Sequence, residues 1–376
     1  MKFDREMFSF ESNNNSPELT MAMTMQILLF VLGLWGCMAI YNSQTLGPSP
    51  LYFVGKQLLW LVSGMAILFI VQRIPFSIFR ENADLLCLLA YIPLLAVLVF
   101  GTRVNGMKGW FSLGFANINL QPSEFSKPFF ILSLCHFGFK YKPGMKRFLT
   151  MGLVTLIWVL PIMLQPDFGT AMIYVAGFIT VYWLTGGTIW HILLIPTVAI
   201  PGITWFLLNN SYALKRISGF LNPALDPLDS GWHIRQFQFT LARGGWMGTK
   251  LGKAIWANSY LPLAHSDSVF ASMTESLGFI GTMPVILLIA TITYIVYRLA
   301  LLAKNSYRKV FIFGMGGLFA FQALVHISVN VTLIPPTGLT LPILSYGGSS
   351  LVATLFGFGI LLSAASIHDQ QPDNQN

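Results

Sequence analysis

Residues 21–41 read MAMTMQILLFVLGLWGCMAIY, an apolar run that contains no charged side chain. A helix needs about 20 consecutive, mostly apolar residues to cross the hydrocarbon core of a bilayer. The run has that length, so it predicts a transmembrane helix. Nine more stretches of similar character follow it. The ten predicted spans are 21–41, 51–72, 84–100, 122–139, 147–164, 168–185, 189–208, 270–298, 309–333 and 342–365.

The composition of the whole chain agrees with this pattern. Of its 376 residues 55% are hydrophobic and 10% are charged, against roughly 25% charged in an average soluble domain. So few charges exclude a disordered chain, a coiled coil and an ordinary cytosolic enzyme. The sequence predicts an all-α polytopic membrane protein with one ten-helix domain over 21–368. The polar ends, 1–20 and 369–376, are predicted to be disordered cytoplasmic tails.

The net charge of +8 does not indicate nucleic-acid binding, because the basic residues gather in short segments between apolar runs. Short loops rich in Lys and Arg face the cytoplasm. An even number of spans places both termini on that side too. The long segment 209–269, between helices 7 and 8, is then predicted to be a large extracytoplasmic loop. The bases that set this orientation are Arg73, Arg80, Lys140, Lys142, Lys146, Arg147, Arg298, Lys304, Arg308 and Lys309.

Four acids lie at or within the outer halves of predicted spans, where ionisable groups are costly and are functional candidates. They are Glu124, Asp167, Asp267 and Glu275. Glu124 and Lys127 are three residues apart and share one helix face. This spacing fits a structural ion pair, or the lining of a cavity for a polar substrate.

The other acids also have two interpretations each. Asp167 is placed to cap the helix that begins near Phe168. Asp267 lies where the long loop enters a helix, with His265 nearby and Glu275 two turns further on. It is either a helix cap or a general base.

The sequence of residues 342–350, PILSYGGSS, interrupts the start of the last span. Its small residues suit close helix packing or the approach of a ligand to the backbone. Basic residues gather on the predicted outer side, and they fit a pyrophosphate, lipid headgroups or a solvated face. These bases are Arg103, Lys108, Lys215, Arg216, Arg235, Arg243, Lys250 and Lys253.

Taken in order, these motifs resemble the SEDS (shape, elongation, division and sporulation) family of RodA/FtsW-type peptidoglycan glycosyltransferases. The resemblance covers about residues 50–365. The stretches that carry it are KGWFSLG (108–114), QPSE (121–124), QPDFGTA (165–171), FLNP (220–223) with Gln236 and Gly244-Gly245, residues 260–281, and PILSYGGSS (342–350).

The resemblance implies ten transmembrane helices with both termini cytoplasmic, in the bacterial cytoplasmic membrane. It implies an enzyme that polymerises lipid II on the outer leaflet, beside a class B penicillin-binding protein that crosslinks the product. The family's catalytic carboxylate matches Asp267, and its intramembrane pair matches Glu124 and Lys127. Its other polar cavity residues match Gln165, Asp167, His265, Glu275 and Ser345.

In the predicted reaction, Asp267 is the base that activates the acceptor hydroxyl. Arg216, Arg243 and Lys108 are candidates to hold the leaving pyrophosphate, and a divalent cation such as Mg²⁺ is left open. Two other functions stay open, a lipid II flippase and a non-catalytic scaffold for the transpeptidase. The sequence does not distinguish a role in elongation, division or sporulation.

Overall fold

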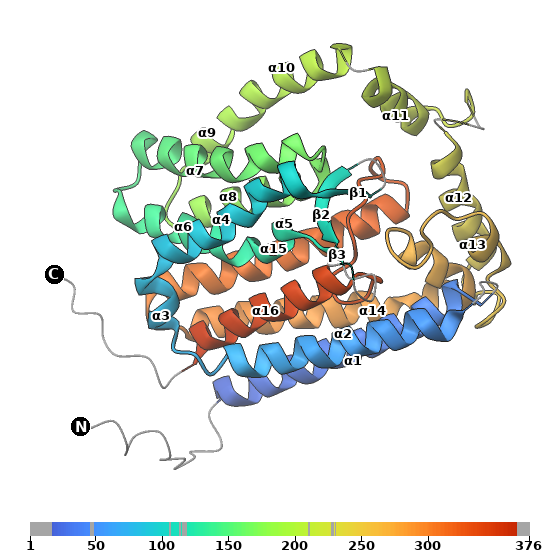
Figure 1. Ribbon diagram of the computed structural model, residues 1–376, viewed down its shortest axis with the longest axis horizontal. Coiled ribbons are helices and arrows are strands. Elements are labelled where there is room, and N and C mark those ends of the chain that lie inside the picture. Colours follow the sequence, from blue (N-terminus) through green and yellow to red (C-terminus); the bar gives the residue numbers. More distant parts are fainter. Residues whose placement is uncertain are drawn as a thin grey trace.

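The computed structural model describes residues 17–45, 49–104, 107–112, 114, 119–209, 211–226, 229 and 231–366. This part of the chain is mostly helical, and seven helices are long and apolar enough to cross a membrane (Figure 1). They are α1 (Pro17–Ser43), α2 (Pro50–Val71), α4 (Ala83–Phe100), α7 (Met145–Leu164), α14 (Val269–Leu302), α15 (Ser306–Asn330) and α16 (Gly348–Ala365). These seven confirm a polytopic membrane protein.

The predicted span 122–139 is built from two helices, α5 (Pro122–Phe125) and α6 (Lys127–Lys140). Pro128 lies in the first turn of α6 and has no backbone N–H. It therefore cannot donate to the carbonyl of Glu124, four residues earlier, and the helical bonding is interrupted there.

Two more predicted spans are also shorter or divided. The span 168–185 is α8 (Phe168–Leu184), an apolar helix of 17 residues. The span 189–208 is α9 (Ile189–Ile192) followed by α10 (Leu194–Asn209). In Figure 1, α10 leads away from the helix bundle.

Two predicted loops contain regular structure. The predicted loop 209–269 holds α11 (Ser211–Leu221), α12 (Trp232–Gly244) and α13 (Ile255–Ser259). The segment 101–121 forms an antiparallel sheet of β1 (Thr102–Val104), β2 (Met107–Ser112) and β3 (Asn119–Leu120), in the order β1-β2-β3. The all-α prediction is wrong for this segment, because a search for long apolar runs does not detect short polar strands. A short helix, α3 (Phe76–Glu81), joins α2 to α4.

Helix α14 is interrupted at Gly278, whose φ of +69° lies in the left-handed region that glycine adopts without strain. The interruption frees backbone groups, and the chain after α12 satisfies them. The N–H of Phe279 donates to the carbonyl of Gly245 at 2.9 Å, and the N–H of Thr249 donates to the carbonyl of Glu275 at 2.8 Å. The segment that follows α12 is thereby fixed to α14 through backbone hydrogen bonds.

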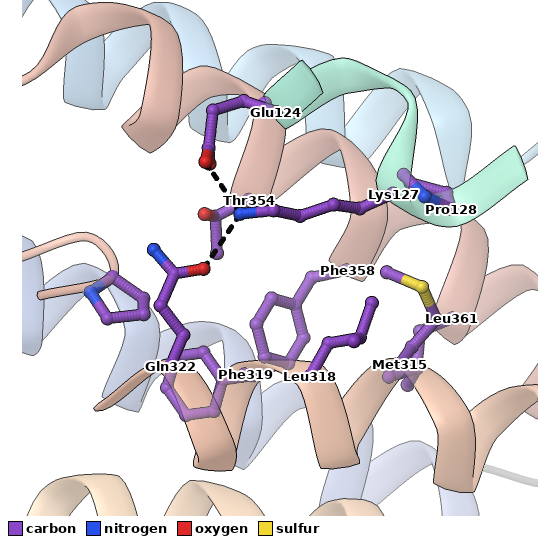
Figure 2. Close-up of a pocket in the computed structure, with 12 residues that line it drawn as sticks. Glu124, Lys127, Pro128, Met315, Leu318, Phe319, Gln322, Thr354, Phe358 and Leu361 are labelled. Atoms are coloured by element: carbon purple, nitrogen blue, oxygen red, sulfur yellow. Dashed lines mark hydrogen bonds and ion pairs between the residues drawn. The ribbon is translucent and has the colours of Figure 1, made fainter. Parts of the chain in front are cut away.

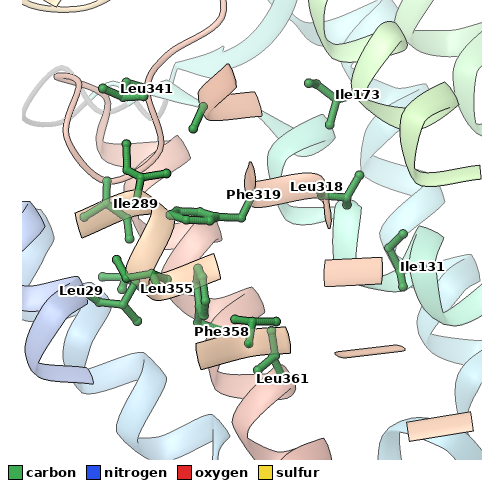
Figure 3. Packing of buried hydrophobic residues seen from close by; sticks show 14 of the residues in the cluster. Leu29, Ile131, Ile173, Ile289, Leu318, Phe319, Leu341, Leu355, Phe358 and Leu361 are labelled. Atoms are coloured by element: carbon green, nitrogen blue, oxygen red, sulfur yellow. The ribbon is translucent and has the colours of Figure 1, made fainter. Parts of the chain in front are cut away.

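Helix α16 is the most buried of the seven long helices and packs along α2. Its side chains Leu355, Phe358 and Leu361 lie in the middle of the apolar core, with Leu29 from α1 and Phe319 from α15 around them (Figure 3). Helix α16 also contacts α15, α5 and α6.

The two ends of the bundle differ in character. Helix α1 begins and α16 ends at one end, whereas the small sheet, α12 and α13 lie at the opposite end (Figure 1). Helix α16 begins at Gly348 rather than at residue 342 as predicted, because residues 341–347 form turns. Helix α1 begins at Pro17, inside the predicted tail 1–20. The rest of that tail and the tail 369–376 lie outside the described residues.

Gly36 of α1 packs directly against the turn at Leu344. A Cβ atom on Gly36 would lie 2.5 Å from the Leu344 carbonyl oxygen. Gly36→Ala should therefore lower the free energy of unfolding by about 1–3 kcal/mol through overpacking. Gly55→Ala, where a Cβ meets no atom within 4 Å, should leave the stability unchanged or raise it by up to about 1 kcal/mol. Thermal unfolding of both variants in detergent measures the difference, and equal stability of the two would contradict this packing.

Candidate active site

Glu124 and Lys127 form the predicted ion pair in the membrane domain. The Lys127 ammonium donates to Glu124 Oε1 at 2.6 Å and to Gln322 Oε1 of α15 at 2.8 Å (Figure 2). The second carboxylate oxygen of Glu124 accepts a hydrogen bond from Ser350 Oγ of α16 at 3.0 Å. The pair is buried, and each charge has a polar partner from another helix in addition to its counter-ion.

A cavity of about 30 Å³ adjoins this pair, lined by Lys127, Gln322, Thr354 and apolar side chains (Figure 2). A volume of this order holds a water molecule and not a sugar. The ion pair therefore has the geometry of a structural element that joins α5, α6, α15 and α16. Its predicted contact with substrate stays a prediction.

Asp167 caps α8, as predicted. Its Oδ1 accepts the N–H of Thr170 at 3.0 Å, and its Oδ2 accepts from Gln121 Nε2 at 3.1 Å. Burial raises the pKa of this carboxyl above its usual range, while the hydrogen bonds from Thr170 oppose the rise. A single buried carboxylate thus joins the start of α8 to the residue that precedes α5.

Gln165 lies close to the strand β2. Its Oε1 is 2.9 Å from the position that a Cβ on Gly109 would occupy, and its Nε2 lies 3.4 Å from the carbonyl oxygen of Leu94. The buried Oε1 has no hydrogen-bond partner among the described residues. An unpaired buried acceptor is uncommon, which keeps Gln165 a candidate for contact with a hydroxyl or a water.

Asp267 lies on a loop that precedes α14 and is joined to the turn before α16. Ser345 Oγ accepts from the N–H of Leu341 at 2.8 Å and donates to the carbonyl of Ser266 at 2.8 Å. The N–H of Tyr346 donates to the carbonyl of His265 at 2.8 Å. The two loops that sequence analysis treated separately therefore form one structural unit.

The Asp267 side chain is half-buried inside this unit. Ser266 Oγ donates to its Oδ1 at 2.9 Å, and a Cβ on Gly338 would lie 3.8 Å from its Oδ2. Burial raises the pKa of Asp267 to about 6; the Ser266 hydrogen bond lowers it and the charge of Asp167 adds to the rise. Helix α14 has no side-chain cap from the preceding residue Ser268, and no capping bond from the Asp267 carboxylate occurs among the described residues. The carboxylate thus has the pKa of a base that works near neutral pH.

His265 is enclosed by aromatic rings rather than by charges. Its ring centroid lies 5.3 Å from those of Phe53 and Tyr346, and its Nδ1 lies 3.1 Å from Gln44 Nε2. Burial lowers the pKa of His265, which favours the neutral ring. It packs beside Asp267's loop as a polar aromatic group.

The Glu275 carboxylate is bound by residues of α12 and α13. Its carboxylate accepts from Arg243 Nε at 3.0 Å, and from the N–H groups of Trp256 at 3.1 Å and Ala257 at 2.7 Å. The latter two belong to the first turn of α13, where a negative charge also favours the helix dipole. Glu275 and Arg243 were predicted as substrate contacts; the structure brings them together and shows that Glu275 caps α13.

Two predicted basic residues remain, Lys108 and Arg216, and the structure describes the side chain of Lys108 alone. Lys108 Nζ donates to the carbonyl of Val99, at the end of α4, at 2.9 Å. Arg216 belongs to α11, but its side chain lies outside the described residues. Within the described residues no group of three or more His, Cys, Asp or Glu side chains is arranged to hold a metal ion. The Mg²⁺ prediction has no donor set there to support it and stays untested.

Sequence analysis missed three polar residues of α15 that contact this region. Gln322, His326 and Asn330 are all buried, and they are spaced four residues apart. Residues with that spacing lie on one face of a helix. Polar side chains recurring every four residues in an apolar span were the signal that would have revealed them.

The family model FTSW_RODA_SPOVE, described as "Cell cycle protein", matches residues 18–370. The chain belongs to this family. A "Probable peptidoglycan glycosyltransferase FtsW" of Trichlorobacter lovleyi is 34% identical over 354 residues, covering 90% of this chain and 92% of that protein. "Stage V sporulation protein E" of Bacillus subtilis is 32% identical over 364 residues, covering 94% and 98%. Family membership and the seven apolar helices identify a multi-pass protein of the cytoplasmic membrane.

Two solved structures are similar over nearly the whole fold. One, described as "Structural coordination of polymerization and crosslinking by a peptidoglycan synthase complex", matches with a TM-score of 0.76 at 28% identity, covering 94% of this chain and 98% of that one. The other is the Thermus thermophilus rod shape determining protein RodA, with a TM-score of 0.65 at 25% identity, covering 93% and 95%. The bundle described above is therefore the fold of this family.

Breaking the Glu124–Lys127 pair on one side should cost more than removing both charges. Lys127→Met leaves the Glu124 carboxylate buried without its counter-ion, which costs about 3–5 kcal/mol of stability in comparable pairs. Glu124→Gln combined with Lys127→Met leaves no buried charge and should recover most of that loss. Thermal unfolding of the single and double variants in detergent measures this, and a double variant less stable than Lys127→Met would contradict the assignment.

Proposed function

We propose that this chain polymerises lipid II into peptidoglycan glycan strands by glycosyl transfer at the outer leaflet. The observation that carries the proposal is Asp267, a half-buried carboxylate on a loop fixed by Ser345, whose pKa is raised to about 6. The names of its relatives, which include peptidoglycan glycosyltransferases, support the same activity.

The proposed reaction needs one base. Lipid II is a disaccharide-pentapeptide linked through an α-glycosidic pyrophosphate to an undecaprenyl chain. The 4-hydroxyl of an acceptor GlcNAc attacks the anomeric carbon of the donor MurNAc, a β-glycosidic C–O bond forms, and the bond to the pyrophosphate breaks. The lipid pyrophosphate leaves with the electron pair, and Asp267 takes the hydroxyl proton. One displacement inverts the configuration, so no covalent enzyme intermediate is required.

The leaving pyrophosphate needs positive charge near it. We propose Lys108, Arg216 and Arg243 for this role. Arg243 is the best supported, because about half of its side chain is exposed and its ion pair with Glu275 holds it at the edge of the outer segment. The other predicted residues, Glu124, Lys127, Gln165, Asp167, His265, Glu275 and Ser345, are proposed to shape the polar interior around the reacting groups.

For the topology we propose ten spans, both termini in the cytoplasm and one membrane domain over 21–368. This count takes α5 with α6, and α9 with α10, as one span each, and adds α8 to the seven long helices. The location of the start of α1 and the end of α16 at the same end of the bundle supports it (Figure 1). The sheet and α11–α13 are then extracytoplasmic.

We also propose a class B penicillin-binding protein as the partner. The similar structure described as coordinating polymerization and crosslinking in one complex supports this pairing. Polymerisation by this chain and crosslinking by such a partner are complementary steps on the same glycan.

Asp267→Asn should reduce lipid II polymerisation by roughly 100-fold or more, because a general base contributes about 10²–10⁴-fold. The measurement is gel analysis of labelled lipid II incubated with the purified chain in liposomes, with and without the transpeptidase partner. Asp229→Asn is the matched control, since Asp229 is an exposed acid in the outer segment paired with Lys215, and it should polymerise at the wild-type rate.

A wild-type rate for Asp267→Asn would remove the base from the mechanism. Lipid II translocation without polymer, by the wild-type chain, would favour a flippase. Full complementation of growth by a polymerisation-dead Asp267→Asn would favour a scaffold.

The polymerisation rate should depend on the ionisation of Asp267. A base must be deprotonated, and burial raises the pKa of this carboxyl to about 6. The rate should therefore rise with pH through about 6 and level off above about 7, and at pH 5 it should be about one tenth of its limit. Initial rates between pH 4.5 and 8.5 test this, and the residual activity of Asp267→Asn should lack the acidic limb. A rate that is flat from pH 5 to 8 contradicts the assignment.

A further inference from the structure

Asn330, the last residue of α15, connects this helix to the loop that carries Asp267. Its Nδ2 donates to the backbone carbonyl of Asp267 at 2.9 Å, and its Oδ1 accepts the N–H of Ala271 at 3.0 Å. Ala271 lies in the first turn of α14, whose N–H groups have no partner within the helix. The buried Asn330 amide thus supports both the first turn of α14 and the backbone of Asp267, which lies two residues before this helix begins.

His326 lies one turn earlier on the same face of α15 and extends this connection. Its Nδ1 is 2.7 Å from the carbonyl oxygen of Leu339, and its Nε2 is 3.3 Å from Asn330 Nδ2. A carbonyl can only accept, so the proton is on Nδ1 and Nε2 is the acceptor that faces Asn330. The two hydrogens of Asn330 Nδ2 have shorter contacts with the carbonyls of Asp267, at 2.9 Å, and of His326, at 3.0 Å, so the approach to Nε2 is the weakest of the three. The bond from His326 Nδ1 to Leu339 is therefore the main link of this ring to the Gly338–Leu339 segment.

The two backbone segments joined in this way enclose the Asp267 carboxylate. One segment carries Asp267 itself, and the other runs through Gly338 and Leu339, with the Gly338 Cβ position 3.8 Å from Asp267 Oδ2. A displacement of either segment changes the place of the carboxylate relative to the attacking hydroxyl. Misplacement of a reacting group by about 1 Å can cost about 10²-fold in rate.

We propose that Asn330 and His326 are positioning residues of the glycosyl transfer, which hold the Asp267 loop and the Gly338–Leu339 segment in the reactive arrangement. Neither side chain touches the reacting atoms in this assignment. The inference rests on the proposed function, in which Asp267 is the base. It adds two buried residues of α15 that act through the backbone.

The test compares two buried asparagines of the full-length chain in liposomes. Asn330→Ala removes the bonds to Asp267 and Ala271 and should lower kcat for labelled lipid II roughly 10- to 100-fold, with KM changed less than about twofold. Asn42→Ala is the matched control. Asn42 is equally buried in α1 and accepts the N–H of Gly252 at 2.8 Å, and its loss should lower the unfolding temperature with kcat within about threefold of wild type.

A second measurement separates positioning from stability. Without the Asn330 bond, the loop loosens and the Asp267 carboxyl becomes more exposed to water. The pH at which the rate of Asn330→Ala reaches half of its limit should therefore move from about 6 toward the usual aspartate pKa near 4. His326→Leu should show the same loss of kcat. His326→Asn keeps a donor for Leu339 and should recover part of it. His326→Leu also serves as the test if Asn330→Ala does not fold.

The proposal is overturned if Asn330→Ala and His326→Leu fold and polymerise with wild-type kcat and an unmoved pH profile. It is also overturned if Asn42→Ala loses as much kcat as they do, because the effect is then one of stability alone. A fully active Asp267→Asn is a different result, since it removes the proposed function itself.

Discussion

Every backbone N–H and C=O group that leaves a helix inside an apolar bilayer must find a partner within the protein. This chain leaves helical geometry at Gly278, in the first third of α14, where the positive φ releases neighbouring carbonyls and amides. The chain from Gly244 to Lys250 supplies their partners, including the bond from the Lys250 N–H to the Ser276 carbonyl at 3.0 Å. The segment that follows α12 is therefore held in place by the interruption of α14.

The same constraint accounts for the architecture around Asp267. The loop before α14 and the turn before α16 both lack regular secondary structure, and each supplies hydrogen-bond partners to the other through Ser345. Gln57 of α2 adds a bond from its Nε2 to the Ser345 carbonyl at 3.1 Å. The irregular backbone of the two segments is satisfied by these bonds, and the same packing leaves the Asp267 carboxylate half-buried.

Sequence analysis predicted the features that depend on local pattern. The long apolar runs predicted the seven long apolar helices, the i,i+3 spacing predicted the Glu124–Lys127 pair, and a carboxylate just before a helix predicted the Asp167 cap. It placed the start of α16 six residues too early, because apolar side chains in residues 342–347 do not distinguish a turn from a helix. It also missed Asn330, whose contact with Asp267 spans 63 residues of sequence. Such a contact depends on how α14 and α15 pack against each other, and no local sequence pattern predicts it.

Backbone strain shows how firmly this region is held. Leu263 and Ile343 have positive φ values of 48° and 68°, a conformation that costs a side-chain-bearing residue about 1–3 kcal/mol. Both flank the unit that holds Asp267, and both are fixed by hydrogen bonds: the Leu263 carbonyl accepts the N–H of Ser266 at 2.9 Å. Strain of this size persists only where the surrounding contacts outweigh it. Since a base gains rate from fixed geometry before the substrate arrives, a rigid, strained loop suits the proposed chemistry better than a relaxed one, and this explains why unfavourable backbone geometry is found beside Asp267.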